Sequence, residues 1–187
     1  MKKLLMIFCT FAMLSPLAKA DVGIYWGTGI PYLSQMGLNL TMGQNWSASV
    51  GTNTLDLSVG DAETTLSMPE LIINWHPFAG SFFIGIGAGQ QTLDVSATEA
   101  LTGATASANV TSTTMIAKLG WMWGKANGGF WMGMDISFIS PSGSEVEIDA
   151  NGLTPADQEY QDVVDAGERF GETAYTNLTF LKLGYLF

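Results

Sequence analysis

Two residue types with catalytic or metal-binding chemistry occur once each in this 187-residue sequence, as His76 and Cys9. A histidine placed with Ser or Asp would suit lipase, acyltransferase or deacylase chemistry. His76 lies beside a tight Pro turn, in Asn74-Trp75-His76-Pro77-Phe78, which favours a structural polar residue. A lone histidine without Cys ligands has no recognisable zinc-site spacing. We therefore predict no catalytic residue, no metal and no cofactor.

Gly85, Gly87 and Gly89 form a Gly-x-Gly-x-Gly run that superficially resembles a phosphate-binding loop. The run lies within a predicted strand, and no P-loop lysine follows it. We expect these glycines to make room for bulky neighbours across a narrow interior, such as Trp131.

Four charged residues are predicted to point inward from their strands: Glu70, Lys118, Asp135 and Lys182. The strand of Asp135 has the strands of Lys118 and Lys182 as its neighbours, so these two lysines could flank it. A charge facing a low-dielectric interior must be paired. Two roles remain open, a gate or ion-selective constriction and a structural plug that fixes strand register and closes the interior.

Residues 1 to 20 have the pattern of a cleaved secretory signal, with Lys2 and Lys3, an apolar run and an Ala18-Lys19-Ala20 cleavage site. The apolar run of about 11 residues is shorter than the roughly 20 needed to span a bilayer. Cys9 lies inside this segment. The mature chain is then one Cys-free domain, residues 21–187, without disulfides.

Apolar residues alternate with small or polar residues at period two along much of the chain, which predicts strands. Pro69 lacks a ladder donor and predicts a bulge or a later start in its strand. Eight strands are expected, at 21–28, 33–42, 45–58, 63–76, 81–96, 107–124, 129–141 and 172–187.

Loop lengths divide the chain into two ends. Short turns are predicted at Gly43-Gln44, at 76–81 and at 124–128, whereas the connections between strands five and six and between seven and eight are long. This asymmetry is typical of outer-membrane barrels, with the short turns in the periplasm. His76 then lies at the periplasmic end, whereas a lipid-modifying enzyme would need it at the outer rim.

The last long connection, residues 142–171, is strongly acidic, and its Thr154-Pro155-Ala156-Asp157 start and apolar spacing predict a short helix near 155–167. We expect this helix to fold over the barrel mouth or to face the medium. The acidic segment could bind divalent cations, a receptor or a surface partner, or be a solvated loop.

Charge is scarce outside this loop, because 10 of the 24 charged residues lie between 143 and 172. The predicted polar faces consist of Gly, Ser, Thr, Asn and Gln, which suits a crowded interior better than a water-facing surface. An eight-stranded lumen is just wide enough for side chains to fill it. The predicted fold is an all-β, eight-stranded antiparallel transmembrane β-barrel with a short helix in the last extracellular loop.

Aromatic residues lie towards the predicted strand ends, where girdles meet lipid headgroups: Tyr25, Trp26, Trp46, Trp75, Trp121, Trp123 and Tyr185. The last strand ends in Phe187, with Tyr185 and Leu183 on the same face. In this feature the chain resembles the outer-membrane β-barrel proteins of Gram-negative bacteria, whose closing strand ends in an aromatic read by the barrel-assembly machinery. As a whole it is similar to the small barrels of the OmpA transmembrane and OmpW-like type.

The resemblance implies a monomer in the cell outer membrane, in contact with its lipid. Its partners would be periplasmic chaperones and the assembly machinery, which would read Tyr185 and Phe187. The acidic balance excludes nucleic acid as a partner. The expected role is structural, in surface interaction, or in narrow passage of small or apolar solutes. Two alternatives are a lipid-modifying outer-membrane enzyme and a soluble secreted ligand-binding β-barrel, which would be released without detergent.

Overall fold

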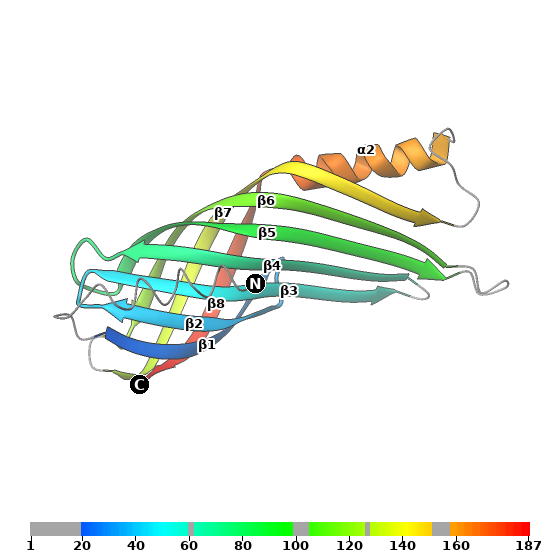
Figure 1. Ribbon diagram of the computed structural model, residues 1–187. Helices are drawn as coiled ribbons and strands as arrows, with labels where there is room; N and C mark the ends of the chain where they lie inside the picture. Colours follow the sequence, from blue (N-terminus) through cyan, green and yellow to red (C-terminus); the bar gives the residue numbers. More distant parts are fainter. Residues whose placement is uncertain (1–19, 60–61, 99–104, 126–127, 151–157) are drawn as a thin grey trace.

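The structure is a computed structural model that describes residues 20–59, 62–98, 105–125, 128–150 and 158–187 (Figure 1). The predicted signal peptide before Ala20 and the predicted helix start at 154–157 lie outside these residues. The elements are β1 (Ala20–Ile30), β2 (Ser34–Met42), β3 (Trp46–Val59), β4 (Ala62–Trp75), β5 (Phe82–Thr98), β6 (Thr105–Trp123), β7 (Gly129–Ala150), α2 (Gln158–Glu172) and β8 (Tyr175–Leu186).

Each strand pairs antiparallel with the next strand in the sequence, and β8 pairs with β1 to close the barrel. The predicted eight-stranded antiparallel barrel with one helix is confirmed. Pro69 is a correction, because β4 runs through it without a register shift, although Met68 and Pro69 are skipped in the β4–β5 ladder. The missing N–H is tolerated there without a bulge.

The barrel wall is uneven in height. The strands β1, β2 and β8 have 11, 9 and 12 residues, whereas β7 has 22. Figure 1 shows β3–β7 projecting past the others at one end, together with α2. We call this the helix end, and the opposite end, with the connections at 43–45, 76–81 and 124–128, the turn end.

The upper half of β7 corrects the sequence prediction, which ended this strand at residue 141. The ladder with β6 continues to Ala150, with Val146 opposite Val110. The acidic residues of this segment alternate with Ser144, Val146 and Ile148, so the stretch has strand periodicity despite its charge. A register shift between Thr111 and Thr113 precedes this part of the ladder.

The helix α2 continues to Glu172, past the predicted end at 167, and it packs against β7 and β6. A Cβ on Gly167 would lie 3.0 Å from Val110 and 3.1 Å from Val146. Val110 shares the inward face of β6 with buried Ser112 and Thr114, so α2 covers the inner face of the projecting wall. Helical glycines allow this close approach.

The polarity of the two faces of the wall is the reverse of that in a soluble protein. Buried side chains that point into the barrel are largely polar: Gln35, Asn39, Thr41, Ser47, Asn53, Asn74, Gln91, Ser112, Thr114, Ser137, Asn177 and Thr179. Exposed side chains on the outer face of β1, β4, β5, β6 and β7 are apolar, among them Val22, Ile24, Leu71, Ile73, Ile84, Ile86, Leu119, Met132 and Met134. No described helix is long and apolar enough to cross a membrane.

Large aromatics gather on the outside at the turn end. Trp46, Trp75, Trp121 and Trp123 are all exposed at strand ends beside the short turns. Tyr25 is a correction to the predicted girdle, because its side chain is 7% exposed and lies inside the barrel.

Candidate functional site in the barrel lumen

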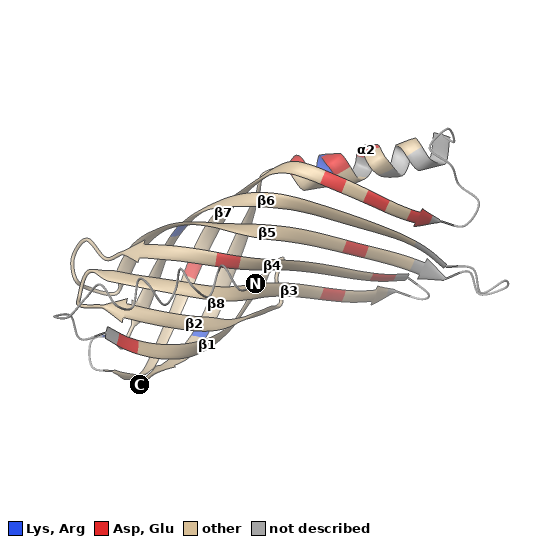
Figure 2. Cartoon of the chain, in the orientation of Figure 1, with Lys and Arg blue, Asp and Glu red and all other residues tan. Residues whose placement is uncertain are grey.

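The four inward charges meet in the middle of the lumen. Lys118 Nζ lies 2.8 Å from Glu70 Oε1 and 4.0 Å from Asp135 Oδ1, and Lys182 Nζ lies 2.7 Å from Asp135 Oδ2. The exposed fractions of the four side chains run from 1% to 12%. Two cations and two carboxylates thus form a neutral chain, which we call the ionic layer. Figure 2 shows how sparse charge is in this part of the wall.

An irregularity in β8 places Asp135 between two partners. The register shifts between Gly133 and Asp135 in the β7–β8 ladder, where Gly133 is opposite Lys182 and Asp135 is opposite Thr179. Both Thr179 and Lys182 then reach the same carboxylate. Thr179 Oγ1 and Ser137 Oγ each donate to Asp135 Oδ1 at 3.2 Å. A buried carboxylate with these donors and an ammonium partner is fully compensated.

The pairing of Lys118 with Glu70 depends on the glycines of β5. Glu70 is on β4 and Lys118 on β6, so the side chains meet across β5. A Cβ at Gly85 would come within 3.2 Å of Lys118 Cβ and 2.4 Å of Asn74 Oδ1. The β5 glycines therefore make room for neighbours on β4 and β6. This corrects the expectation that they accommodate Trp131.

Trp131 is accommodated by a different glycine. A Cβ on Gly184 of β8 would lie 2.2 Å from Trp131 Cε2 and 2.4 Å from its Nε1. The Trp131 ring is also tilted against the ring of Tyr25 at 6.3 Å. Tyr25 in turn lies 5.1 Å from Lys182 Nζ, which joins the aromatic group to the ionic layer.

Two apolar layers flank the ionic layer. The turn-end layer consists of Tyr25, Phe83, Met122, Trp131 and Leu186. The helix-end layer consists of Tyr32, Leu66, Met68, Ile72, Ile116 and Ile139, with Leu55, Leu93, Phe170 and Tyr175 packed on it. Phe170 comes from α2, so the helix contributes to this closure.

Hydrogen bonds tie the helix-end layer together. The hydroxyls of Tyr32 and Tyr175 lie 2.5 Å apart, and Tyr175 donates to Gln91 Oε1 at 2.6 Å. Tyr32 comes from the connection after β1, and Tyr175 begins β8. The polar atoms of both tyrosines are thus satisfied inside an apolar cluster.

His76 is fully buried at the turn end, immediately after β4. Its Nδ1 lies 3.1 Å from the Phe82 carbonyl, so this nitrogen carries the proton, and Nε2 then accepts from Ser47 Oγ at 3.2 Å. The group that orients the ring is a backbone carbonyl and not a carboxylate. Asn74 donates to the same serine at 3.3 Å. The arrangement closes the barrel floor.

We predict that His76 makes the stability of the barrel depend on pH. Burial, with a contribution from Lys125, lowers the pKa of His76 from 6.5 to about 4. Between these values the unfolded chain binds a proton that the folded barrel does not, so stability falls as pH falls from 6.5 towards 4. The expected loss is on the order of 2 kcal/mol. Urea unfolding at pH 7.5 and 4.5 measures it.

The matched variant for this prediction is His76→Gln, whose amide keeps a polar group but does not titrate. The difference in free energy of unfolding between wild type and variant should change with pH between 6.5 and 4 and stay constant above about pH 7. Parallel pH profiles for the two proteins would contradict the assignment.

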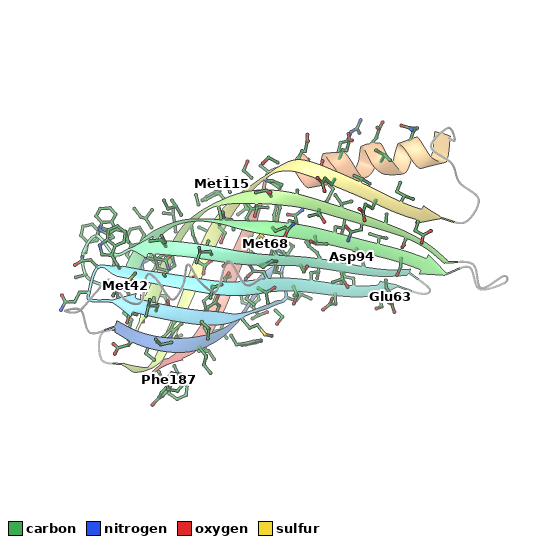
Figure 3. The ribbon with its side chains drawn as sticks, in the orientation of Figure 1. Met42, Glu63, Met68, Asp94, Met115 and Phe187 are labelled. Atoms are coloured by element: carbon green, nitrogen blue, oxygen red, sulfur yellow. The ribbon has the colours of Figure 1, made fainter. Side chains whose placement is uncertain are left out.

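The outer face of the projecting wall is acidic. Asp94, Asn109 and Glu147 are directly opposite one another across β5, β6 and β7, and Asn109 Nδ2 donates to Asp94. Figure 2 shows acidic residues on the projecting parts of β3, β4, β5 and β7 and on α2, and Figure 3 labels Glu63 and Asp94 there. Within the described ranges no three His, Asp or Glu residues are arranged to hold a metal ion.

The C-terminal aromatics lie at the turn end, on the outside. Phe187 is 72% exposed, and its amide donates to the Val22 carbonyl at 2.8 Å. The ring of Tyr185 contacts the rings of Phe187 and Phe130, each at 5.3 Å. Figure 3 shows Phe187 away from the lumen.

Comparisons with known proteins give structural similarity alone. No family model matches the sequence, and no curated relative matches it. A major outer membrane protein from Thermus thermophilus superposes with a TM-score of 0.57 and 11% identity, over 91% of this chain and 99% of that chain. CarO2 and CarO of Acinetobacter baumannii give TM-scores of 0.46 and 0.43, each at 12% identity, over 89% and 93% of this chain and 98% and 99% of theirs. The chain shares the fold of an outer-membrane barrel.

Proposed function

We propose that the protein is an integral outer-membrane β-barrel whose lumen is closed and whose role is structural and in surface interaction. Its outward face is apolar, and its interior holds most of the buried polar and charged side chains, which suits a lipid solvent. The fold shared with an outer-membrane protein supports the location. The turn end would lie in the periplasm and the helix end outside, as in other barrels with short periplasmic turns. A monomer of the small OmpA or OmpW-like type fits the strand number.

The ionic layer carries the proposal of a closed lumen. Lys118 and Lys182 hold Glu70 and Asp135 in contacts of 2.7–2.8 Å inside a ring of eight strands. The cavity beside this layer, lined by Asn39, Asn74 and Lys182, has about 30 Å³ of volume. That volume holds roughly two water molecules. A continuous water-filled path would require both apolar layers and the ion pairs to separate.

We predict that the refolded protein, residues 21–187, gives a flat current trace in planar bilayers at both polarities. The ionic layer has no net charge and each of its charges is paired, so a moderate voltage does not provide the free energy to separate its ion pairs. Folded insertion is checked beforehand by heat-modifiable migration in gels. Discrete conductance steps that a bulky lumen substitution such as Gly120→Leu abolishes would instead support the alternative, a gate or narrow pore.

The acidic wall and α2 favour the surface-interaction part of the proposal. In this orientation Asp94, Glu147 and the helix face the medium, and a cationic partner would be attracted to them. At the opposite end, exposed Tyr185 and Phe187 are available to the barrel-assembly machinery and to periplasmic chaperones during export. Cell fractionation separates this proposal from the soluble secreted barrel, because an integral protein needs detergent for release.

The lipid-modifying alternative has less support. Its histidine would have to meet substrate at the outer rim, whereas His76 lies at the turn end with its ring fully buried. Ser47, its hydroxyl partner, is equally inaccessible. Hydrolysis of a fluorogenic phospholipid by the refolded protein, lost in His76→Gln, would revive that alternative.

A further inference from the structure

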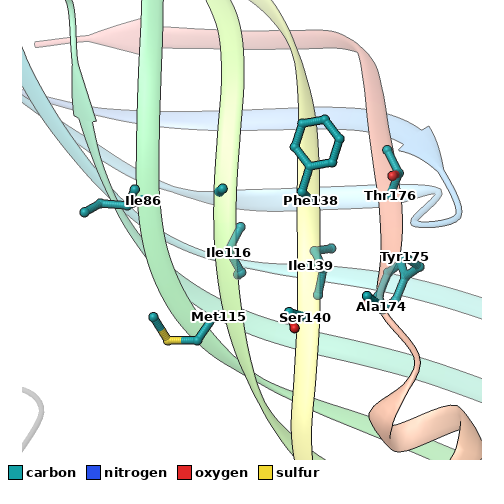
Figure 4. A pocket seen from close by; sticks show the side chains of 10 residues that line it. Ile86, Met115, Ile116, Phe138, Ile139, Ser140, Ala174, Tyr175 and Thr176 are labelled. Carbon is teal, nitrogen blue, oxygen red and sulfur yellow. The ribbon is translucent and has the colours of Figure 1, made fainter.

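An apolar groove of about 520 Å³ crosses the outer face of the barrel on β5–β8. Its lining includes the small residues Ala117, Ser140 and Ala174. The larger side chains of Ile86, Met115 and Phe138 come from three neighbouring strands, β5, β6 and β7 (Figure 4). The groove is mainly apolar, because most of the side chains that line it carry no polar atom. A volume of this size is typical of small-molecule sites, roughly 300–1,000 Å³.

Strand register explains why the groove exists. Ile86, Ala117, Phe138 and Thr176 are directly opposite one another across the four strands. The next outward row includes Ala88, Met115 and Ser140. Between these rows the side chains of Ile116 and Ile139 point into the lumen and leave only backbone outside. Large and small residues thus alternate so that a channel remains open across the sheet.

The outward rows of residues on either side of the groove show at which level of the barrel wall it lies. The row on its helix-end side is polar throughout, with Gln90, Thr113 and Ser142 paired across β5, β6 and β7. The row on its turn-end side is apolar throughout: Ile84, Leu119, Ile136 and Leu178. The groove therefore occupies the last apolar level below a polar boundary. In a membrane-embedded barrel this level is where the acyl chains of the outer leaflet begin.

We propose that this groove is a binding site for one acyl chain of an outer-leaflet lipid, whose headgroup lies at the row of Gln90, Thr113 and Ser142. This inference rests on the proposed membrane location. The groove is continuous with the apolar outer face that lipid covers, which favours an acyl chain over a protein partner. Four strands spaced by about 4.8 Å give the groove a span of about 14 Å around the wall, which accommodates a segment of one acyl chain.

The test uses the refolded protein, residues 21–187, delipidated in detergent and titrated with palmitoyl-oleoyl phosphatidylethanolamine. Native mass spectrometry counts lipid adducts. Wild type should retain one lipid at concentrations where Ala117→Phe, which fills the groove, retains at least tenfold less. The matched control is Ala48→Phe, an outward alanine on β3 opposite Leu40 and Ile73, which should bind like wild type.

Equal adduct populations in wild type and Ala117→Phe would overturn the proposal, as would a dimer peak that Ala117→Phe removes, because the occupant would then be a second copy. Heat-modifiable migration shows whether each variant is folded, and Ser140→Leu replaces Ala117→Phe if that variant is not. The closed-lumen proposal fails separately, since conductance reports on the interior and lipid retention on the outer face.

Discussion

Replacing Asp135 by asparagine is expected to lower the free energy of unfolding in lipid vesicles by about 3–5 kcal/mol, as for other buried ion pairs that lose one partner. The asparagine fits the same space but leaves Lys182 without its 2.7 Å carboxylate contact. Lys118 keeps Glu70 at 2.8 Å, so most of the loss concerns Lys182. Urea unfolding followed by tryptophan fluorescence measures the change.

Two further variants isolate the buried charge in this experiment. Asp94→Asn removes an exposed carboxylate from the outer wall and should change stability by less than about 0.5 kcal/mol. The double variant Asp135→Asn with Lys182→Gln removes both charges of the pair and should recover a large part of the loss. A single variant as stable as Asp94→Asn would show that Lys182 turns to water, and that the ionic layer does not close the lumen.

The strand number and closure could be predicted because the chemistry of each strand alternates so regularly. Outward Ile84 and Leu119 are apolar, and inward Asn74 and Gln91 are polar, so the period-two pattern determined both faces. The fold depends on this average property of many residues. One irregular residue, such as Pro69, does not alter it.

Contacts inside the lumen depend on strand register. The alternation of apolar and polar residues shows which side of the sheet a residue faces but not which residue lies opposite it. Alternation places Lys118 and Glu70 on the inward side, but their contact crosses β5 and requires the missing side chain of Gly85. The register shift between Gly133 and Asp135 arises from an extra residue in β8. The only sequence feature that marks it is the pair of consecutive apolar residues Phe180-Leu181, which interrupts the alternation. The pairing of Lys182 with Asp135 at this position is therefore a result of three-dimensional structure.

The acidic segment shows a different limit of sequence reasoning. Charge density suggested a loop from residue 142, whereas β7 continues to Ala150. Pairing with β6 and cover by α2 stabilise a strand there, because Val146 contacts both. Tertiary packing thus outweighs composition where an apolar residue recurs at every second position.

A substitution of Gly184 by alanine is expected to destabilise the barrel by about 1–3 kcal/mol, the usual range for overpacking. The added methyl group would lie 2.2 Å from the indole of Trp131. The ring cannot retreat easily, because Tyr25 packs against it at 6.3 Å and the strand wall confines it. Melting followed by the loss of heat-modifiable migration measures the effect.

Gly80→Ala is the matched control for Gly184→Ala, since the nearest atom to its added methyl group is 3.8 Å away. It should melt close to wild type. The double variant Gly184→Ala with Trp131→Leu tests the cause directly, because the smaller side chain leaves room for the methyl group. If steric conflict with the indole causes the loss, adding the alanine to a Trp131→Leu background should cost much less than adding it to wild type. Equal costs in both backgrounds would instead locate the strain in the β7–β8 backbone, and the turn-end layer would then be less tightly packed than its contacts indicate.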